Sequence, residues 1–243
     1  MRLLVVPDAG ALARIAADLW RARLRSKPDL VMAVPAGRTP RLMYARLREL
    51  QAVDPVDFSA MRVFSIDELC PPAPASGYFW QQVRREFLDW AGVPPARCFP
   101  FRVDAADGEA MCRRYETTIA DCGGLDLAML GLGPNAHVAS NEPGTAWDSR
   151  TRPVTLLPQT VEYIGTDGPN TITAGGPVSD RAVTLGLATL LAAREIVVLV
   201  SGPGKRDALR RVVDGPLTPE VPASALRTHP CCLIVADREA APR

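Results

Sequence analysis

Short apolar runs alternate with longer amphipathic stretches along most of the chain. Seven runs have the composition of strands: Arg2–Val6, Asp29–Val34, Met61–Ile66, Leu125–Leu130, Arg181–Thr184, Ile196–Val200 and Cys232–Val235. Strands that are covered on both faces read as nearly continuous apolar runs, and parallel strands between layers of helices have this environment. The pattern therefore predicts a buried, mostly parallel sheet.

Between these runs, apolar residues recur at helical spacing, as at Leu12, Ile15 and Leu19. The predicted helices are Ala11–Leu24, Arg41–Leu50, Tyr78–Trp90, Gly108–Ile119, Gly186–Ala193 and one that follows Gly202–Lys205 and ends near Val212. The alternation indicates the α/β class: a single doubly wound, mostly parallel sheet with helices on both faces. Because no long linker or shift of composition divides residues 1–243, we expect one domain.

Such sheets bind ligands beyond the carboxyl ends of their strands. One predicted strand ends in the small-residue turn Pro35–Pro40, in which Ala36, Gly37, Arg38 and Thr39 precede a helix. Backbone N–H groups at a helix start attract anions, so this turn is a candidate phosphate site. The alternative is an ordinary turn, in which Thr39 caps the helix and the final proline occupies the first helical position.

Two further strand ends carry charged residues. Gly202–Lys205 is a second glycine turn before a helix, and Lys205 could neutralise a phosphate unless it is only a solvated lysine. Asp67 and Glu68 follow another strand and are candidates for acid/base chemistry or substrate binding. Neighbouring side chains in a strand point in opposite directions, so only one of these carboxylates can face a site. A helix cap or a surface pair is the alternative for them.

The fourth strand end runs through Gly131–Gly133 to Asn135 and His137, one of only two histidines in the chain. Histidine carries protons near neutral pH, and Glu142, five residues later, could orient or charge its ring. A histidine beside a turn is more often structural, but the position after a strand end favours function. We interpret the other histidine, His229, as structural because it precedes a proline and a strand.

Composition narrows the classes of partner. The 28 basic and 27 acidic residues nearly cancel, so no overall field favours nucleic acid or an anionic membrane. The six cysteines lack CxxC spacing and have only two histidines to help them, so we expect no metal site. The N-terminal apolar run is too short for a signal peptide, and no run approaches the roughly 20 apolar residues of a membrane span. We therefore expect a cytoplasmic protein.

Together these segments resemble the glucosamine-6-phosphate deaminase family, which shares a fold with the 6-phosphogluconolactonases. The resemblance extends from Val31 to about Asp237, and its most specific part is LGLGPNAHVASNEPG at 130–144, followed by SRTR at 149–152. It implies an enzyme of amino-sugar metabolism that converts glucosamine 6-phosphate and water to fructose 6-phosphate and ammonium. It implies no metal or organic cofactor. The small-molecule partner is a sugar phosphate, and the sequence leaves monomer and homo-oligomer open.

The resemblance also implies roles for the candidates. His137 opens the sugar ring, with Asn135 and Glu142 shaping its protonation, and Asp67 moves the proton of the second carbon. Residues 35–39 and Lys205 hold the phosphate.

The chain departs from the family pattern at four positions. Asn135 stands where many members carry aspartate, so negative charge beside the imidazole must come from Glu142. Ala136 replaces the usual glycine, and Ser140 replaces a bulky residue. Arg38 could clamp the phosphate in place of the arginine that many members use and that is missing between Thr160 and Gly176. Two alternatives remain open: a 6-phosphogluconolactonase-type hydrolase, and a non-catalytic protein that binds sugar phosphates.

Overall fold

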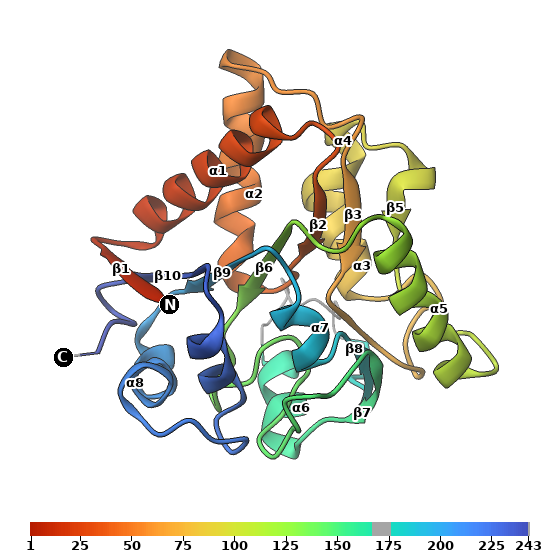
Figure 1. Cartoon of the computed structure of the whole chain (residues 1–243), viewed down its shortest axis with the longest axis vertical. Coiled ribbons are helices and arrows are strands. Elements are labelled where there is room, and N and C mark those ends of the chain that lie inside the picture. Colours follow the sequence, from red (N-terminus) through yellow and green to blue (C-terminus); the bar gives the residue numbers. More distant parts are fainter. Residues whose placement is uncertain (167–175, 243) are drawn as a thin grey trace.

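The central sheet of the computed structural model, which describes residues 1–166 and 176–242, has seven strands (Figure 1). Their order across the sheet is β1 (Arg2–Val6), β10 (Cys232–Asp237), β9 (Glu195–Val200), β6 (Leu127–Gly131), β2 (Val31–Val34), β3 (Arg62–Ser65) and β5 (Cys98–Phe99). Every neighbouring pair is parallel. The carboxyl ends of β2, β3 and β6 therefore lie at one edge, where the candidate residues follow them.

Helices cover both faces of this sheet. One face packs against α1 (Ala9–Ser26), α2 (Arg38–Val53), α3 (Phe79–Val83) and the π-helical turn η1 (Arg84–Leu88), which continues into α4 (Asp89–Ala91). The other face packs against α5 (Gly108–Asp121), α7 (Leu187–Leu191), α8 (Arg206–Asp214) and the 3₁₀ segment η5 (Pro222–Thr228). Successive strand residues alternate between the two cores: Val31 and Ala33 belong to one, Met32 and Val34 to the other. The predicted α/β class and doubly wound sheet are confirmed.

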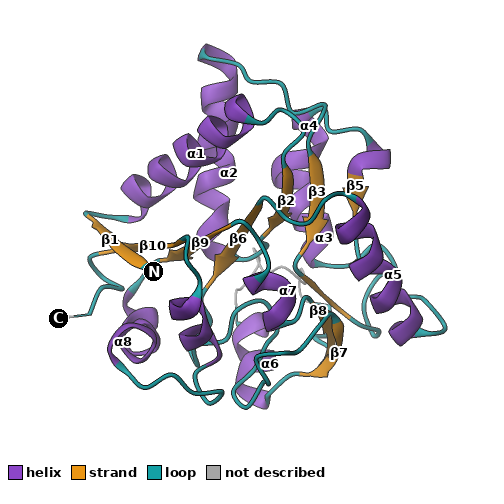
Figure 2. Ribbon diagram, viewed as in Figure 1, coloured by secondary structure: helices purple, strands orange, loops and turns teal. Residues whose placement is uncertain are grey.

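A second, antiparallel sheet was not predicted. It has the order β4 (Asp67–Leu69), β8 (Arg181–Thr184) and β7 (Arg152–Thr155), and it lies beside the central sheet with α6 (Pro158–Gly165) (Figure 2). The expectation that residues 181–184 join the parallel sheet is therefore wrong. β4 and β7 are short and carry charged residues or a proline, so neither shows the apolar run of a buried strand.

The remaining short segments are the 3₁₀ turns η2 (Pro95–Arg97) and η4 (Pro203–Lys205). Within the described residues, no helix is long and apolar enough to cross a membrane. The assignment of the whole chain to one domain stays a prediction from the sequence.

Candidate active site

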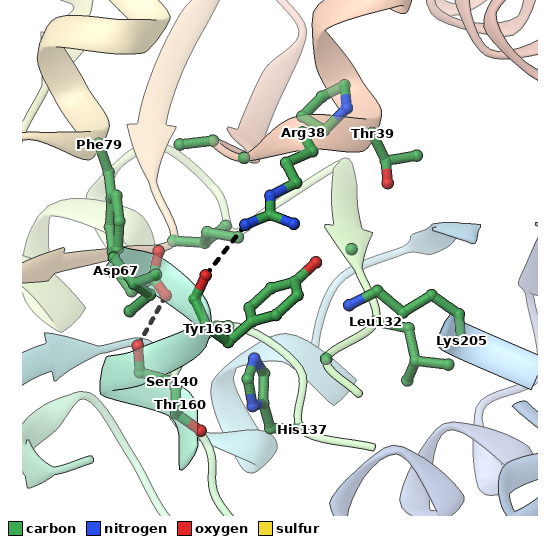
Figure 3. Close-up of a pocket in the computed structure, with 18 residues that line it drawn as sticks. Arg38, Thr39, Asp67, Phe79, Leu132, His137, Ser140, Thr160, Tyr163 and Lys205 are labelled. Atoms are coloured by element: carbon green, nitrogen blue, oxygen red, sulfur yellow. Dashed lines mark hydrogen bonds between the residues drawn. The ribbon is translucent and has the colours of Figure 1, made fainter. Parts of the chain in front are cut away.

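A pocket opens at the carboxyl ends of β2, β3 and β6, where loops from both sheets converge (Figure 3). Seven of the residues predicted from the sequence line it: Ala36, Gly37, Arg38, Thr39, Asp67, His137 and Lys205. Asn135 and Glu142 lie behind His137, whereas Glu68 lies outside the pocket. Segments more than a hundred residues apart thus meet at one cavity.

The turn after β2 exposes the start of α2 to the pocket. Helix α2 begins at Arg38, three residues earlier than expected, and Gly37 precedes it with a φ of 116°, a conformation that side chains disfavour. The side-chain amide of Gln82 in α3 holds the backbone of Gly37. The amide oxygen accepts a 2.9 Å hydrogen bond from the Gly37 N–H, and the amide N–H₂ donates one of 2.8 Å to the Gly37 carbonyl. Thr39 and Pro40 lie inside the helix, and no side chain among the described residues caps it, so the alternative of a Thr39 cap with Pro40 at the first helical position is wrong.

Lys205, in η4, is a buried cation at the same pocket. Its side chain forms no ion pair within the described residues, and its Nζ lies 4.3 Å from the centre of the Tyr163 ring. Burial, and then the nearby charge of Arg38, lower the pKa of this lysine to about 8. A buried ammonium with no carboxylate partner in the described part of the chain is a site that an anionic ligand would stabilise.

Tyr163 of α6 links the two basic residues. The Arg38 guanidinium lies 4.5 Å from the ring centre and donates a 3.1 Å hydrogen bond to the Tyr163 carbonyl (Figure 3). The aromatic ring thus contacts both cations, an arrangement that stabilises cations on the ring faces. Tyr163 could not be predicted from the sequence, because a lone tyrosine in a stretch without strong periodicity carries no signal of its own. The segment between Thr160 and Gly176, where many family members are expected to carry a phosphate-binding arginine, lies partly outside the described residues.

Asp67 brings a buried carboxylate to the other side of the pocket. Its Oδ2 accepts a 2.8 Å hydrogen bond from the Ser140 hydroxyl. Burial raises the pKa of Asp67 to about 7, the Ser140 hydrogen bond opposes this rise, and the charge of Glu68 adds to it. A carboxylate that titrates near neutral pH is a suitable general base, because half of it is ionised where enzymes usually work.

Glu68, next to Asp67, binds the backbone. Its carboxylate accepts hydrogen bonds of 2.8–3.0 Å from the backbone N–H groups of Leu69, Tyr78, Phe79 and Trp80. These donors include the first turn of α3, so Glu68 caps that helix and fixes the loop before it. Both carboxylate oxygens thus bind the backbone and Glu68 does not line the pocket, so its assignment as a substrate ligand stays a prediction from the sequence without support from this geometry.

His137 is backed by Glu142 and Asn135. The imidazole Nδ1 lies 3.6 Å from Glu142 Oε2, and the same oxygen accepts a 2.7 Å hydrogen bond from the Asn135 amide. The Asn135 Oδ1 in turn accepts a 3.1 Å hydrogen bond from the backbone N–H of His137. Burial raises the pKa of Glu142, but hydrogen bonds and the charge of His137 outweigh it and leave the pKa below its ordinary value. An ionised Glu142 can stabilise an imidazolium, and Asn135 orients both partners.

The loop that presents His137 has an unusual backbone. Ala136 and Ala139 have φ values of 71° and 49°, in the left-handed region that residues other than glycine rarely adopt. Asn141 holds this loop in place, since its amide donates to the carbonyls of Val138 at 3.0 Å and Leu185 at 2.8 Å. Such strain persists only where surrounding contacts enforce it, and it gathers at functional sites.

The family model described as glucosamine-6-phosphate isomerases/6-phosphogluconolactonase matches residues 8–234. The chain is 35% identical to the glucosamine-6-phosphate deaminase of Halothermothrix orenii over 99% of both chains. It is also 35% identical to glucosamine-6-phosphate deaminase 1 of Bacillus subtilis, over 95% of this chain and 94% of that one.

Solved structures agree with this similarity. A structure described as a monomeric glucosamine-6-phosphate deaminase superposes with a TM-score of 0.92 at 32% identity, over 99% of this chain and 98% of that one. A 6-phosphogluconolactonase from Trypanosoma brucei gives a TM-score of 0.74 at 21% identity, over 98% and 97% of the two chains. At that identity the second likeness concerns the fold alone.

Proposed function

The chain belongs to the family of glucosamine-6-phosphate isomerases and 6-phosphogluconolactonases, and within it we propose that this protein is a glucosamine-6-phosphate deaminase. The enzyme converts glucosamine 6-phosphate and water to fructose 6-phosphate and ammonium. The full-length relatives that carry the deaminase name support this assignment. The observation that carries it is Asp67, a buried carboxylate at the pocket that titrates near pH 7.

The phosphate end of the pocket is where the positive groups gather. Arg38 and Lys205 both contact the Tyr163 ring there, and the uncapped start of α2 adds backbone N–H groups beside Thr39. Phosphate favours such a combination of charges and helix-start amides. We assign the 6-phosphate to this end, with residues 36–39 and Lys205 as its ligands.

The reacting end carries Asp67 and His137. In the proposed mechanism, His137 transfers the proton that opens the sugar ring, and Glu142 stabilises the imidazolium formed in that step. Asp67 then removes the proton from the second carbon, and a proton is returned to the first carbon, so that the open-chain amino aldose becomes a ketose imine. Water adds to this imine and ammonium leaves, which gives fructose 6-phosphate. Burial makes Asp67 a stronger base than an exposed aspartate, which a carbon-bound proton requires.

Two alternative functions make different demands on these groups. Hydrolysis of 6-phosphogluconolactone needs a base for water but no base for a carbon-bound proton. A non-catalytic sugar-phosphate binding protein needs neither Asp67 nor His137 at the pocket. The presence of both groups at the pocket favours deamination.

The direct test offers both substrates to the purified protein. We expect ammonium release from glucosamine 6-phosphate, with fructose 6-phosphate formed in equal amount, and little hydrolysis of 6-phosphogluconolactone. A coupled ammonium assay and a lactone assay, run on the same preparation, measure the two rates. Rapid lactone hydrolysis without ammonium would establish the hydrolase instead, and fructose 6-phosphate binding without either reaction would establish the binding protein.

A second prediction concerns Lys205 and pH. Because the pKa of Lys205 in the free protein is about 8, its charge is present below that pH and is lost above it. The affinity for fructose 6-phosphate, which has the phosphate but no amine, should therefore fall as the pH rises through 8. Isothermal titration at pH 7 and pH 9 measures the change.

Two variants isolate the lysine in this titration. Lys205→Met removes a charge-assisted contact worth about 1.5–3 kcal/mol, so it should weaken binding roughly ten- to a hundredfold at pH 7. Lys205→Arg should bind at both pH values with little difference, because arginine keeps its charge. Equal pH dependence in the wild type and Lys205→Met would refute the assignment of this lysine to the phosphate.

A further inference from the structure

Asp67 and Glu68 are adjacent, buried carboxylates with different surroundings. Glu68 accepts four backbone hydrogen bonds, which occupy both of its oxygens. Within the described residues, the Asp67 carboxylate accepts a single hydrogen bond, from the Ser140 hydroxyl to Oδ2. Its other oxygen, Oδ1, remains available at the pocket that Asp67 and Ser140 line together.

Ser140 is held in place by the strand that also holds Asp67. The Ser140 N–H donates a 3.0 Å hydrogen bond to the hydroxyl of Thr184 on β8, and Thr184 is the register partner of Asp67 in the antiparallel β4–β8 pair. Ala139, in its left-handed conformation, turns the chain immediately before Ser140. The donor and the carboxylate are thus fixed to the same residue of one strand, so their 2.8 Å contact does not depend on a flexible loop alone.

On these contacts, and resting on the proposed deaminase function, we propose that Ser140 is a positioning residue for the base: its hydroxyl fixes Asp67 Oδ2 so that Oδ1 faces the second carbon of the sugar. The hydroxyl donates a hydrogen bond to a carboxylate that keeps its charge, so Ser140 makes and breaks no covalent bond. A single donor orients the Asp67 carboxylate and leaves it basic. Four donors, as at Glu68, would oppose the rise of its pKa more strongly.

The Ser140 hydrogen bond also sets where Asp67 titrates. It favours the charged carboxylate, so its removal should raise the pKa of Asp67 further above 7. The other titratable or charged groups near Asp67 are its strand neighbour Glu68, which lies outside the pocket, and the pocket residues His137 after β6 and Arg38, Tyr163 and Lys205 at the phosphate end. Replacement of Ser140 alters none of these groups, so a shift in the profile reports on Asp67.

The test compares Ser140→Ala with a matched variant, Ser65→Ala. The Ser65 hydroxyl donates a 2.8 Å hydrogen bond to the Asp67 backbone carbonyl. Ser65→Ala therefore removes a buried hydrogen bond to Asp67 without affecting its carboxylate. In Ser140→Ala the acidic limb of kcat/KM should move to higher pH by about one unit. At pH 9, where Asp67 is ionised but no longer oriented, kcat/KM of Ser140→Ala should still be lower than that of the wild type, by on the order of tenfold.

Ser65→Ala should keep the wild-type midpoint, and Ser140→Thr, which keeps a hydroxyl, should restore it. A second measurement makes the inference independent of turnover: the Asp67 carboxylate is titrated by ¹³C NMR in wild type, Ser140→Ala and Asp67→Asn, the last of which assigns the signal. An upward shift of about one unit in Ser140→Ala is expected.

The outcomes separate this inference from the proposed function. An unmoved NMR midpoint, or a midpoint that moves while kcat/KM keeps its wild-type profile, overturns the role of Ser140. If the wild type releases no ammonium, the deaminase function is contradicted. If the NMR midpoint of Asp67 in Ser140→Ala still differs from that in the wild type, the link between Ser140 and Asp67 remains supported.

Discussion

Replacement of Asp67 by asparagine should abolish ammonium release while sugar-phosphate binding remains. Asparagine has the shape of aspartate but cannot accept the proton of the second carbon, and a general base of this kind contributes about 10²- to 10⁴-fold. We expect kcat to fall by that factor and the dissociation constant for fructose 6-phosphate to change little, since the phosphate ligands lie at the other end of the pocket. A steady-state ammonium assay and isothermal titration measure the two quantities.

The stability of the same variant separates a catalytic role from a structural one. The pKa of Asp67 rises from 3.8 to about 7 on folding, so the folded wild type holds an extra proton between these values and loses stability as the pH rises through that window. Asp67→Asn has no such penalty. It should be more stable than the wild type at pH 8, by on the order of 2–4 kcal/mol, and the difference should vanish near pH 4.

Urea unfolding at pH 4 and pH 8 measures this difference. Glu68→Gln is the matched variant, because it alters a buried carboxylate next in sequence that caps α3. Burial raises the pKa of Glu68 as well, but a glutamine at this position would turn its amide N–H₂ toward a backbone N–H donor, and the lost acceptor should lower the stability of this variant. Asp67→Asn that retains turnover, or that loses stability at pH 8 as Glu68→Gln does, would show that Asp67 is a structural residue.

The second large effect is expected from Gly133→Ala. A Cβ at this position would lie 2.4 Å from both Cε1 and Nε2 of His137, far inside van der Waals contact. The imidazole must therefore move, and a displaced acid/base group should cost about 10²-fold or more in kcat/KM. Overpacking should also lower the free energy of unfolding by roughly 1–3 kcal/mol. Ammonium release and urea unfolding measure the two effects.

Gly108→Ala provides the control for this substitution. A Cβ on Gly108, the first residue of α5, would meet only Pro153 Cγ at 3.7 Å, an ordinary contact, so activity should stay at the wild-type level. The assignment of ring opening to His137 predicts that Gly133→Ala is impaired on glucosamine 6-phosphate even when it is fully folded. A folded Gly133→Ala with wild-type kcat/KM would contradict it.

The seven apolar runs predicted strands because burial on both faces leaves a strong one-dimensional pattern. Six of them lie in the central sheet within a few residues of the predicted bounds. The seventh, 181–184, is also a strand, but its partners are β4 and β7 rather than the parallel sheet. Apolar character indicates that a segment is buried and does not specify its neighbour. The bounds of β4, β5 and β7 could not be predicted, because β5 has only two residues and β4 and β7 carry charged residues or a proline in place of an apolar run.

The candidate site shows the same division. His137, Asp67, Lys205 and the turn at residues 36–39 were predictable, since each follows a strand and belongs to a recognisable motif. Glu68 was assigned to the substrate because a carboxylate beside Asp67 looks equivalent to it in sequence. Tyr163 and Gln82 were missed because their importance lies in what they contact: two cations in one case, and both ends of the Gly37 peptide in the other.

By itself the sequence determined the fold class, the family resemblance and the residue types available for chemistry, because these depend on local pattern and on short motifs. Only the tertiary structure decided which of two adjacent carboxylates faces the pocket, and that Ser140 donates to it. The physical reason is that these contacts come from distant segments: β8 supplies Thr184, which accepts from the Ser140 N–H, the loop after β6 supplies Ser140, and α3 supplies two of the four donors to Glu68. The base strength of Asp67 is a property of that assembly and of no segment alone.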